Sequence, residues 1–133
     1  MRKGEKFTPI NISYVLDICN KYGLVSGNSE MEMGDFYGNC TKTRISFGID
    51  EKTAEYAPIV NIYENGYIVL FDTPYICKNY HNGVYNYYVE PNGSHSASSV
   101  ERFEKYIVKG IEEHKRIHEI CNKMNAELLN KVD

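Results

Sequence analysis

A long run of apolar residues spaced by three and four positions constrains the fold of this chain more than any other feature. Its members are Val100, Phe103, Ile107, Gly110, His114, Ile117, Cys121, Met124 and Leu128. Steps that alternate between three and four return each member to one face of an α-helix, as in the heptad repeat of coiled coils. The run therefore predicts one helix from about residue 99 to 131, with Ser98 as its N-cap and Glu101 completing a capping box.

The predicted helix is long for a chain of 133 residues. It would measure roughly 50 Å, whereas a compact chain of this size has a diameter of roughly 35 Å. We therefore expect it to bend at Gly110, a weak helix former, or to overhang the body. An overhanging apolar stripe needs a cover, and a second copy of the chain is the simplest one. The sequence thus predicts a homo-oligomer with a seam of Phe103, Ile107, His114, Ile117, Cys121, Met124 and Leu128.

The first third of the chain predicts a shorter helix and a loop. Apolar residues at helical spacing predict a helix from about residue 9 to 22. Thr8 is the expected N-cap and Gly23 the residue just past the C-terminal end. The Gly- and Ser-containing stretch from Val25 to Ser29 is expected to be a loop.

The middle of the chain carries strand signals. Alternating and apolar runs between residues 30 and 89 predict a meander of five or six antiparallel strands. Asn65-Gly66 and Asn82-Gly83 each separate two such runs and predict hairpins, because both residues tolerate positive φ. The fold class is therefore α+β, with an N-terminal helix, the meander and the long C-terminal helix in one domain of residues 1–133.

Composition and charge narrow the class of protein. The net charge is −3, whereas a general nucleic-acid binder normally has a basic excess. The N-terminal residues lead into no apolar stretch, and no run is long enough to cross a membrane. The four cysteines form no CxxC pair and are expected to be free thiols in a reducing compartment. We therefore expect a cytoplasmic protein with no membrane contact. Abundant Asn, Lys, Tyr and Ile are typical of AT-rich bacterial or phage genomes.

Tyrosines are concentrated in the meander and suggest a binding surface. Eight of the twelve fall between Tyr56 and Tyr88. Tyrosine is common in interfaces because it combines a large apolar area with a polar tip, although it is also a good strand former. The candidate partner- or ligand-binding residues here are Tyr75, Tyr80, Tyr85, Tyr87, Tyr88 and Lys78. Stacking on RNA bases is an alternative use of such a sheet, but Lys78 is the only cation in the second hairpin to meet phosphate.

The loop before the long helix is a second candidate. Ser94 and His95 lie in a hydroxyl-rich stretch that enters the predicted helix N-terminus. Free N–H groups at a helix N-terminus can hold an anion, although helix capping alone explains the hydroxyls.

The sharpest polar cluster in the chain lies on and beside the long repeat. His114, His118 and Cys121 share one helix face, and imidazole and thiolate are ligands for zinc. A fourth ligand would have to come from His81, His95 or a partner chain, and the metalloprotease motif is absent. We therefore predict that the three residues serve in packing and that no metal or cofactor is bound.

These patterns favour a non-enzymatic binding protein. It would act through the Tyr-rich sheet, or through the groove between sheet and helix, and oligomerise through the long helix. A phage or mobile-element inhibitor of a host protein, or a protein that sequesters a small ligand, would fit this description. The alternatives are a small metal- or thiol-dependent enzyme using His114, His118 and Cys121, and an RNA-contacting domain.

Overall fold

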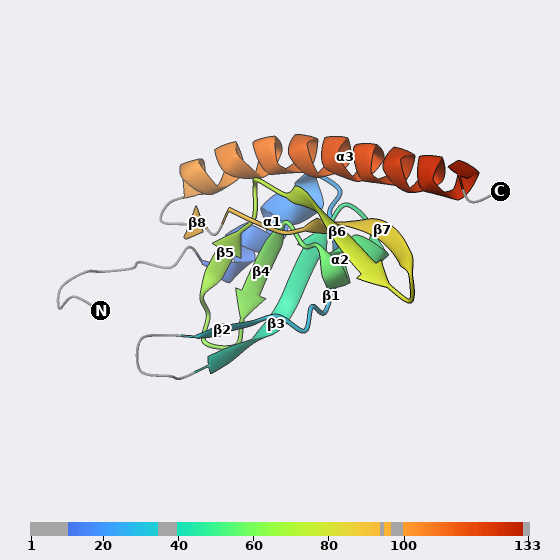
Figure 1. The fold of residues 1–133 in the computed structure, drawn as a ribbon. Helices are drawn as coiled ribbons and strands as arrows, with labels where there is room; N and C mark the ends of the chain where they lie inside the picture. The colour runs from blue at the N-terminus through green and yellow to red at the C-terminus, as the bar shows by residue number, and fades with distance from the viewer. Residues whose placement is uncertain (1–10, 35–39, 94, 97–99, 132–133) are drawn as a thin grey trace.

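The computed structural model describes residues 11–34, 40–93, 95–96 and 100–131 and has an α+β fold, as expected. The elements in chain order are α1 (Ile12–Lys21), β1 (Val25–Gly27), β2 (Glu32–Gly34), β3 (Cys40–Gly48), α2 (Glu51–Tyr56), β4 (Val60–Tyr63), β5 (Ile68–Leu70), β6 (Tyr75–His81), β7 (Val84–Glu90), β8 (His95–Ser96) and α3 (Val100–Lys131). Figure 1 shows α3 lying along one side of the molecule, across the strands and α1.

The long C-terminal helix is confirmed, and the bend at Gly110 is wrong. Helix α3 runs through Gly110 without interruption and curves only gently (Figure 1). Gly110 is buried, and a Cβ built on it would lie 3.4 Å from Asp72 and from Ile59. The small residue thus lets α3 come close to the segment that follows β5. The predicted N-cap of α3, Ser98, lies outside the described residues.

Helix α1 begins later than the sequence predicted. It starts at Ile12, and the side chain of Asn11 caps it by accepting a hydrogen bond from the Ser13 N–H at 2.9 Å. Thr8, the expected cap, lies outside the described residues. The C-terminal end agrees with the prediction, because Gly23 has a φ of 72° and its N–H donates to the Asn20 carbonyl. Only glycine adopts this conformation readily.

The main sheet has the order β1-β3-β4-β5-β8, with β2 paired to one end of β3, and all its pairings are antiparallel. Its core lies between the strands, α1 and the first half of α3, where Phe103 and Ile107 pack on Ile59, Ile62 and Leu70. The loop predicted from Val25 is wrong for its first three residues, because they pair with the end of β3 as β1.

A short helix, α2, was not predicted from the sequence. Asp50 and Thr53 form a capping box at its start. The helix covers the end of β3, where the Ser46 hydroxyl donates to the Ala54 carbonyl and Gly48 lies against the α2 backbone. Ser46 and Gly48 are therefore buried, although alternation along β3 places them on the face opposite the buried Phe47.

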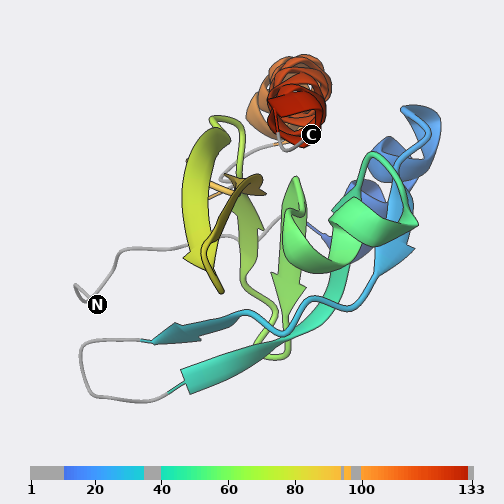
Figure 2. The same cartoon turned by 45° about the vertical axis from the view of Figure 1, so that its right-hand side comes forward.

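The strands fall into two sheets instead of one continuous meander. Strands β6 and β7 pair only with each other among the described residues. After β5 the chain leaves the main sheet through Asp72, which is buried against Gly93 and Gly110. The β6–β7 hairpin instead packs along the second half of α3, and Figure 2, which views α3 nearly end-on, places it on the opposite side from α2.

The two Asn-Gly turns differ in type. Asn82 and Gly83 have φ values of 51° and 80°, as a two-residue type I′ turn requires. At the other turn only Gly66 has positive φ, and its N–H donates to the Tyr63 carbonyl at 2.9 Å. The turn between β4 and β5 is therefore a three-residue loop that ends in a left-handed glycine, and the type I′ expectation is wrong there.

None of the helices in the described ranges is both long and apolar enough to cross a membrane.

Candidate functional site

The predicted binding tyrosines lie on two opposite faces of the β6–β7 hairpin. The strand register pairs Cys77 with Tyr88, Lys78 with Tyr87 and Tyr80 with Tyr85. Because side chains alternate along a strand, Tyr75 and Tyr88 share the face of Cys77. Tyr80, Tyr85 and Tyr87 lie on the face that also carries Ile76 and the buried Val89.

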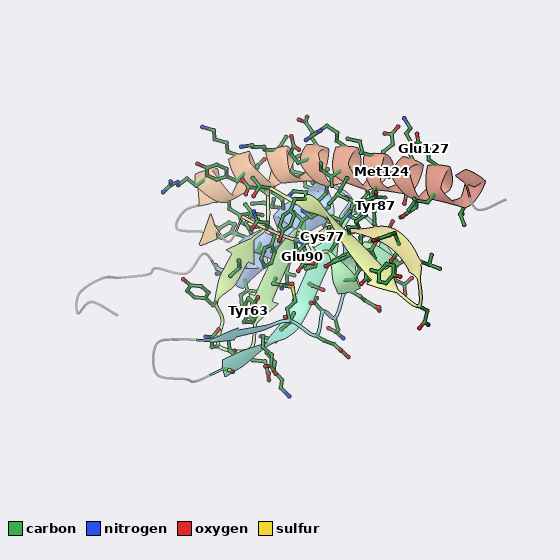
Figure 3. All side chains as sticks on the ribbon, viewed as in Figure 1. Tyr63, Cys77, Tyr87, Glu90, Met124 and Glu127 are labelled. Atoms are coloured by element: carbon green, nitrogen blue, oxygen red, sulfur yellow. The ribbon has the colours of Figure 1, made fainter. Side chains whose placement is uncertain are left out.

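On the first face, a thiol lies beside two exposed phenols. Proximity of the Cys77 thiolate raises the pKa of Tyr75, and a hydrogen bond with Cys77 is the main cause that raises the pKa of Tyr88. Figure 3 shows Cys77 and Glu90 on this hairpin. The two tyrosines therefore present polar tips around one half-buried sulfur atom.

On the second face, an aromatic pair covers the end of the hairpin. The rings of Tyr80 and Tyr85 lie 4.6 Å apart, and the Lys78 ammonium lies 4.4 Å from the centre of the Tyr85 ring. Tyr80 is nevertheless 61% exposed. Lys78 is therefore held over an aromatic face by a cation–π contact while both tyrosines stay open to a partner.

Asn125 of α3 fixes the hairpin, a contact that the sequence did not predict. Its side-chain oxygen accepts from the Tyr87 N–H at 2.8 Å, and its amide donates to the Tyr87 carbonyl at 2.9 Å. The side chain thus replaces a neighbouring strand along the edge of β7. Figure 3 shows Tyr87 at this boundary between β7 and α3.

The predicted oligomer seam is largely covered by the chain itself. Phe103, Ile107, His114 and Cys121 are buried, whereas Ile117, Met124 and Leu128 are half-buried. The first half of the stripe packs on the main core, and Cys121 packs with Val89 in a second cluster that includes Ile117. Self-association stays a prediction, and the part of the stripe that remains open for it lies toward the C-terminal end of α3.

His114 is buried and neutral. Its Nε2 lies 2.7 Å from the Phe71 carbonyl oxygen, and since a carbonyl only accepts, this nitrogen carries the proton. Burial lowers the pKa of His114 to about 4, and the hydrogen bond to Phe71 opposes the shift. Its Nδ1 has no hydrogen-bond partner among the described residues.

Burial shifts the pKa values of the neighbouring His118 and Cys121 toward neutral side chains. Burial lowers the pKa of His118, against the charge of Asp50, and burial raises the pKa of the Cys121 thiol. A catalytic thiolate–imidazolium pair needs a lowered thiol pKa and a basic imidazole. Both pKa values here are shifted the opposite way, which favours neutral side chains. Within the described ranges, no three His, Cys, Asp or Glu side chains are grouped to hold a metal ion.

A cleft between α2, α3 and β7 lies beside these residues. It consists of two hollows of about 380 Å³ each, one reaching β7 and the other reaching the start of α2. Both are lined by Lys52, Tyr56, His118 and Asn122, and we call this feature the α2–α3 cleft. Sequence reasoning missed it because it depends on α2. His114 lies outside its lining, so the predicted trio is divided.

Of the two candidate residues before α3, the structure describes only His95. Ser94 lies outside the described residues. His95 belongs to β8, where its backbone pairs with Leu70 at the edge of the main sheet.

Comparisons with protein-family models, with curated proteins and with solved structures find no significant match to this chain.

Proposed function

We propose that this chain is a non-enzymatic binding protein that takes up an extended segment of a partner protein along the outer edge of β6. The observation that carries the proposal is the backbone of that edge, with which no other described strand pairs. Because Asn125 occupies the N–H and C=O of Tyr87, the pair of Tyr87 with Lys78 is not hydrogen-bonded across the hairpin. Hydrogen-bonded and non-hydrogen-bonded pairs alternate along two antiparallel strands. Ile76 and Tyr80 therefore also belong to pairs that are not hydrogen-bonded across the hairpin.

Three residues of β6 therefore direct their backbone groups away from β7. These are Ile76, Lys78 and Tyr80, and no other strand of the described ranges pairs with them. Free edge groups are a template for another strand. In contrast, the Asn125 side chain occupies the edge of β7 at Tyr87, so the outer edge of β6 is the more open of the two.

The side chains of the hairpin support a protein partner. Exposed apolar side chains gather here, namely Tyr75, Tyr80, Val84, Tyr85 and Tyr88. Lys78 is the only formally charged residue between Ile76 and Val89. A partner strand with an acidic residue opposite Lys78 is thus favoured. Pairing of β6 with β6 of a second copy, centred on Lys78, would instead place two lysines opposite each other, which is unfavourable.

Binding of a partner segment along β6 supports a regulatory role for the protein. Binding of an extended acidic segment needs no catalytic group, in keeping with the neutral His118 and Cys121. The composition supports a phage or mobile-element origin and action in the cytoplasm, so inhibition of a host protein is the role that we favour.

A peptide titration tests the edge. The probe is Thr-Val-Thr-Glu-Thr-Val-Thr, blocked at both ends. We expect amide NMR shifts and slower hydrogen exchange at Ile76, Lys78 and Tyr80. The Lys78→Glu variant should bind about tenfold more weakly, because an attractive charge pair becomes a repulsive one.

Two controls make this test specific. Lys109→Glu changes an exposed lysine elsewhere on α3 and should leave peptide affinity unchanged. The same peptide with alternate amides N-methylated should not bind, because it cannot complete the strand ladder. Binding that survives both N-methylation and Lys78→Glu would refute pairing along this edge.

Self-association is a second candidate function, supported by an apolar groove at the end of α3. The groove measures about 470 Å³ and is lined by Gly83, Val84, Tyr85, Asn86, Asn125, Leu128 and Leu129. None of these residues is charged, and Leu129 is 73% exposed. A two-fold-related copy would bring an identical apolar surface against it.

Light scattering at micromolar concentration tests self-association. We expect a mass that is a multiple of 15.3 kDa, reduced by Leu129→Glu because a buried charge would oppose the interface. Val108→Glu, at another exposed apolar residue of α3, serves as the matched control. A monomeric unmodified chain would refute self-association without affecting the edge-binding proposal.

A further inference from the structure

We infer that the α2–α3 cleft binds a small molecule that combines a planar ring with one anionic group. This site is separate from the outer edge of β6 and does not depend on the proposed function. Three features of the cleft support this: the volume of its two open hollows, a buried imidazole nitrogen without a partner among the described residues, and the unequal distribution of charge between the hollows.

The two hollows meet at a pair of rings. Tyr56 of α2 and His118 of α3 pack edge to face, with ring centres 6.1 Å apart and planes at 86°. Each hollow has a volume of about 380 Å³, which lies within the range of small-molecule sites. The size suits a molecule of one or two rings.

His118 supplies the unsatisfied polar group. It is only 8% exposed, and its Nε2 is buried without a hydrogen-bond partner among the described residues. A buried polar group without a partner is unfavourable, so a ligand that pairs with this nitrogen gains a specific interaction. Tyr56, which is 45% exposed, packs edge to face against the imidazole.

Charge distinguishes the two hollows. The hollow that reaches β7 contains Lys52 as its only charged lining residue. The other hollow contains two cations and two acidic residues, namely Lys52, Lys115, Asp50 and Glu119. An anionic group is therefore favoured on the β7 side, where it meets Lys52 and no carboxylate.

The β7 hollow also suits a planar ring. Tyr87 lines it from the hairpin face that carries Val89, and a planar ring stacks or packs edge to face on tyrosine. Asn86 and Asn122 line it as well, and their amides make no hydrogen bond to another described residue. Asn125 differs, because its amide is already engaged by Tyr87. The free amides and the neutral imidazole can pair with polar atoms on the ring.

Two sources of this chemistry need to be distinguished. An aromatic carboxylate and a nucleoside monophosphate both carry a planar ring and an anionic group. The probes are benzoate, indole-3-carboxylate and uridine monophosphate. Calorimetry and saturation-transfer NMR on the full chain report whether either class binds and which binds more tightly.

We expect saturable binding of at least one probe. Lys52→Gln should weaken it about tenfold, because a charge-assisted contact is lost, and His118→Phe should weaken it by removing Nε2 while keeping a ring. Lys52 is exposed on α2, so its variant tests the site even where His118→Phe fails to fold. Lys115→Gln is the matched control and should leave the affinity unchanged.

The outcomes decide the inference. No saturable binding of any probe, or binding that Lys52→Gln leaves intact, would overturn it. An equal loss in Lys115→Gln would overturn the placement in the β7 hollow. Lys78→Glu should leave probe binding unchanged, so failure here and failure of the outer edge of β6 can be told apart.

Discussion

Replacing Gly48 with alanine should lower the free energy of unfolding by about 2–3 kcal/mol, because the added methyl group has no space. A Cβ at Gly48 would lie 2.5 Å from the Ala54 nitrogen, 2.8 Å from its Cα and 2.9 Å from the Thr53 carbonyl carbon. All three atoms belong to the α2 backbone, which cannot rotate away as a side chain can. Helix α2 would have to move off β3 and stretch the hydrogen bond from Ser46 to Ala54.

Gly110→Ala provides the matched control. Gly110 is also buried, but its nearest neighbours would lie 3.4 Å from the new Cβ, at an ordinary contact distance. Alanine favours the helix interior over glycine by about 1 kcal/mol. We therefore expect a gain of about 0.5–1 kcal/mol. Urea unfolding at pH 7 measures both variants, and a Gly48→Ala protein as stable as the unmodified chain would contradict the packing of α2 on β3.

Elements with strong local signals were predictable from the sequence. Helix α3 follows a regular apolar repeat with nine members. Strands β6 and β7 flank a turn whose two residues both adopt positive φ. In each of these elements the local sequence preferences agree with the final structure, so tertiary contacts do not change the predicted element.

Elements that depend on tertiary contacts were not predictable. Helix α2 has only six residues, too few for an apolar stripe, and it depends on small residues at Ser46 and Gly48. These residues fitted a half-exposed strand equally well. The separation of the β6–β7 hairpin likewise depends on Asn125, 38 positions away from Tyr87. Periodicity contains no information about such a distant side-chain contact.

The candidate sites divide in the same way. The hairpin tyrosines and the His114, His118 and Cys121 face could be found from residue type and spacing. The free edge of β6 could not, because it depends on the hairpin standing apart from the main sheet. The α2–α3 cleft could not either, since one wall belongs to the unpredicted helix.

Mild acid should destabilise the protein through His114. The folded state holds the pKa of His114 at about 4, against 6.5 for an unperturbed histidine. Between pH 6.5 and pH 4, His114 is protonated in the unfolded chain but remains neutral in the folded chain. Stability is therefore complete above pH 6.5 and is lost as the pH falls toward 4, by about 2 kcal/mol at pH 5 from this residue.

The His114→Gln variant isolates this effect. A glutamine amide can still donate to the Phe71 carbonyl but does not titrate, so the variant should lose much less stability between pH 7.5 and pH 5 in urea unfolding. The window avoids Asp50 and Glu104, whose pKa values are lowered and which titrate at lower pH. His118→Gln should also reduce the pH dependence, because burial lowers the pKa of His118 against the opposing charge of Asp50. If His114→Gln kept the full dependence, protonation of His114 could not be its cause, and the neutral, buried imidazole would have to be abandoned.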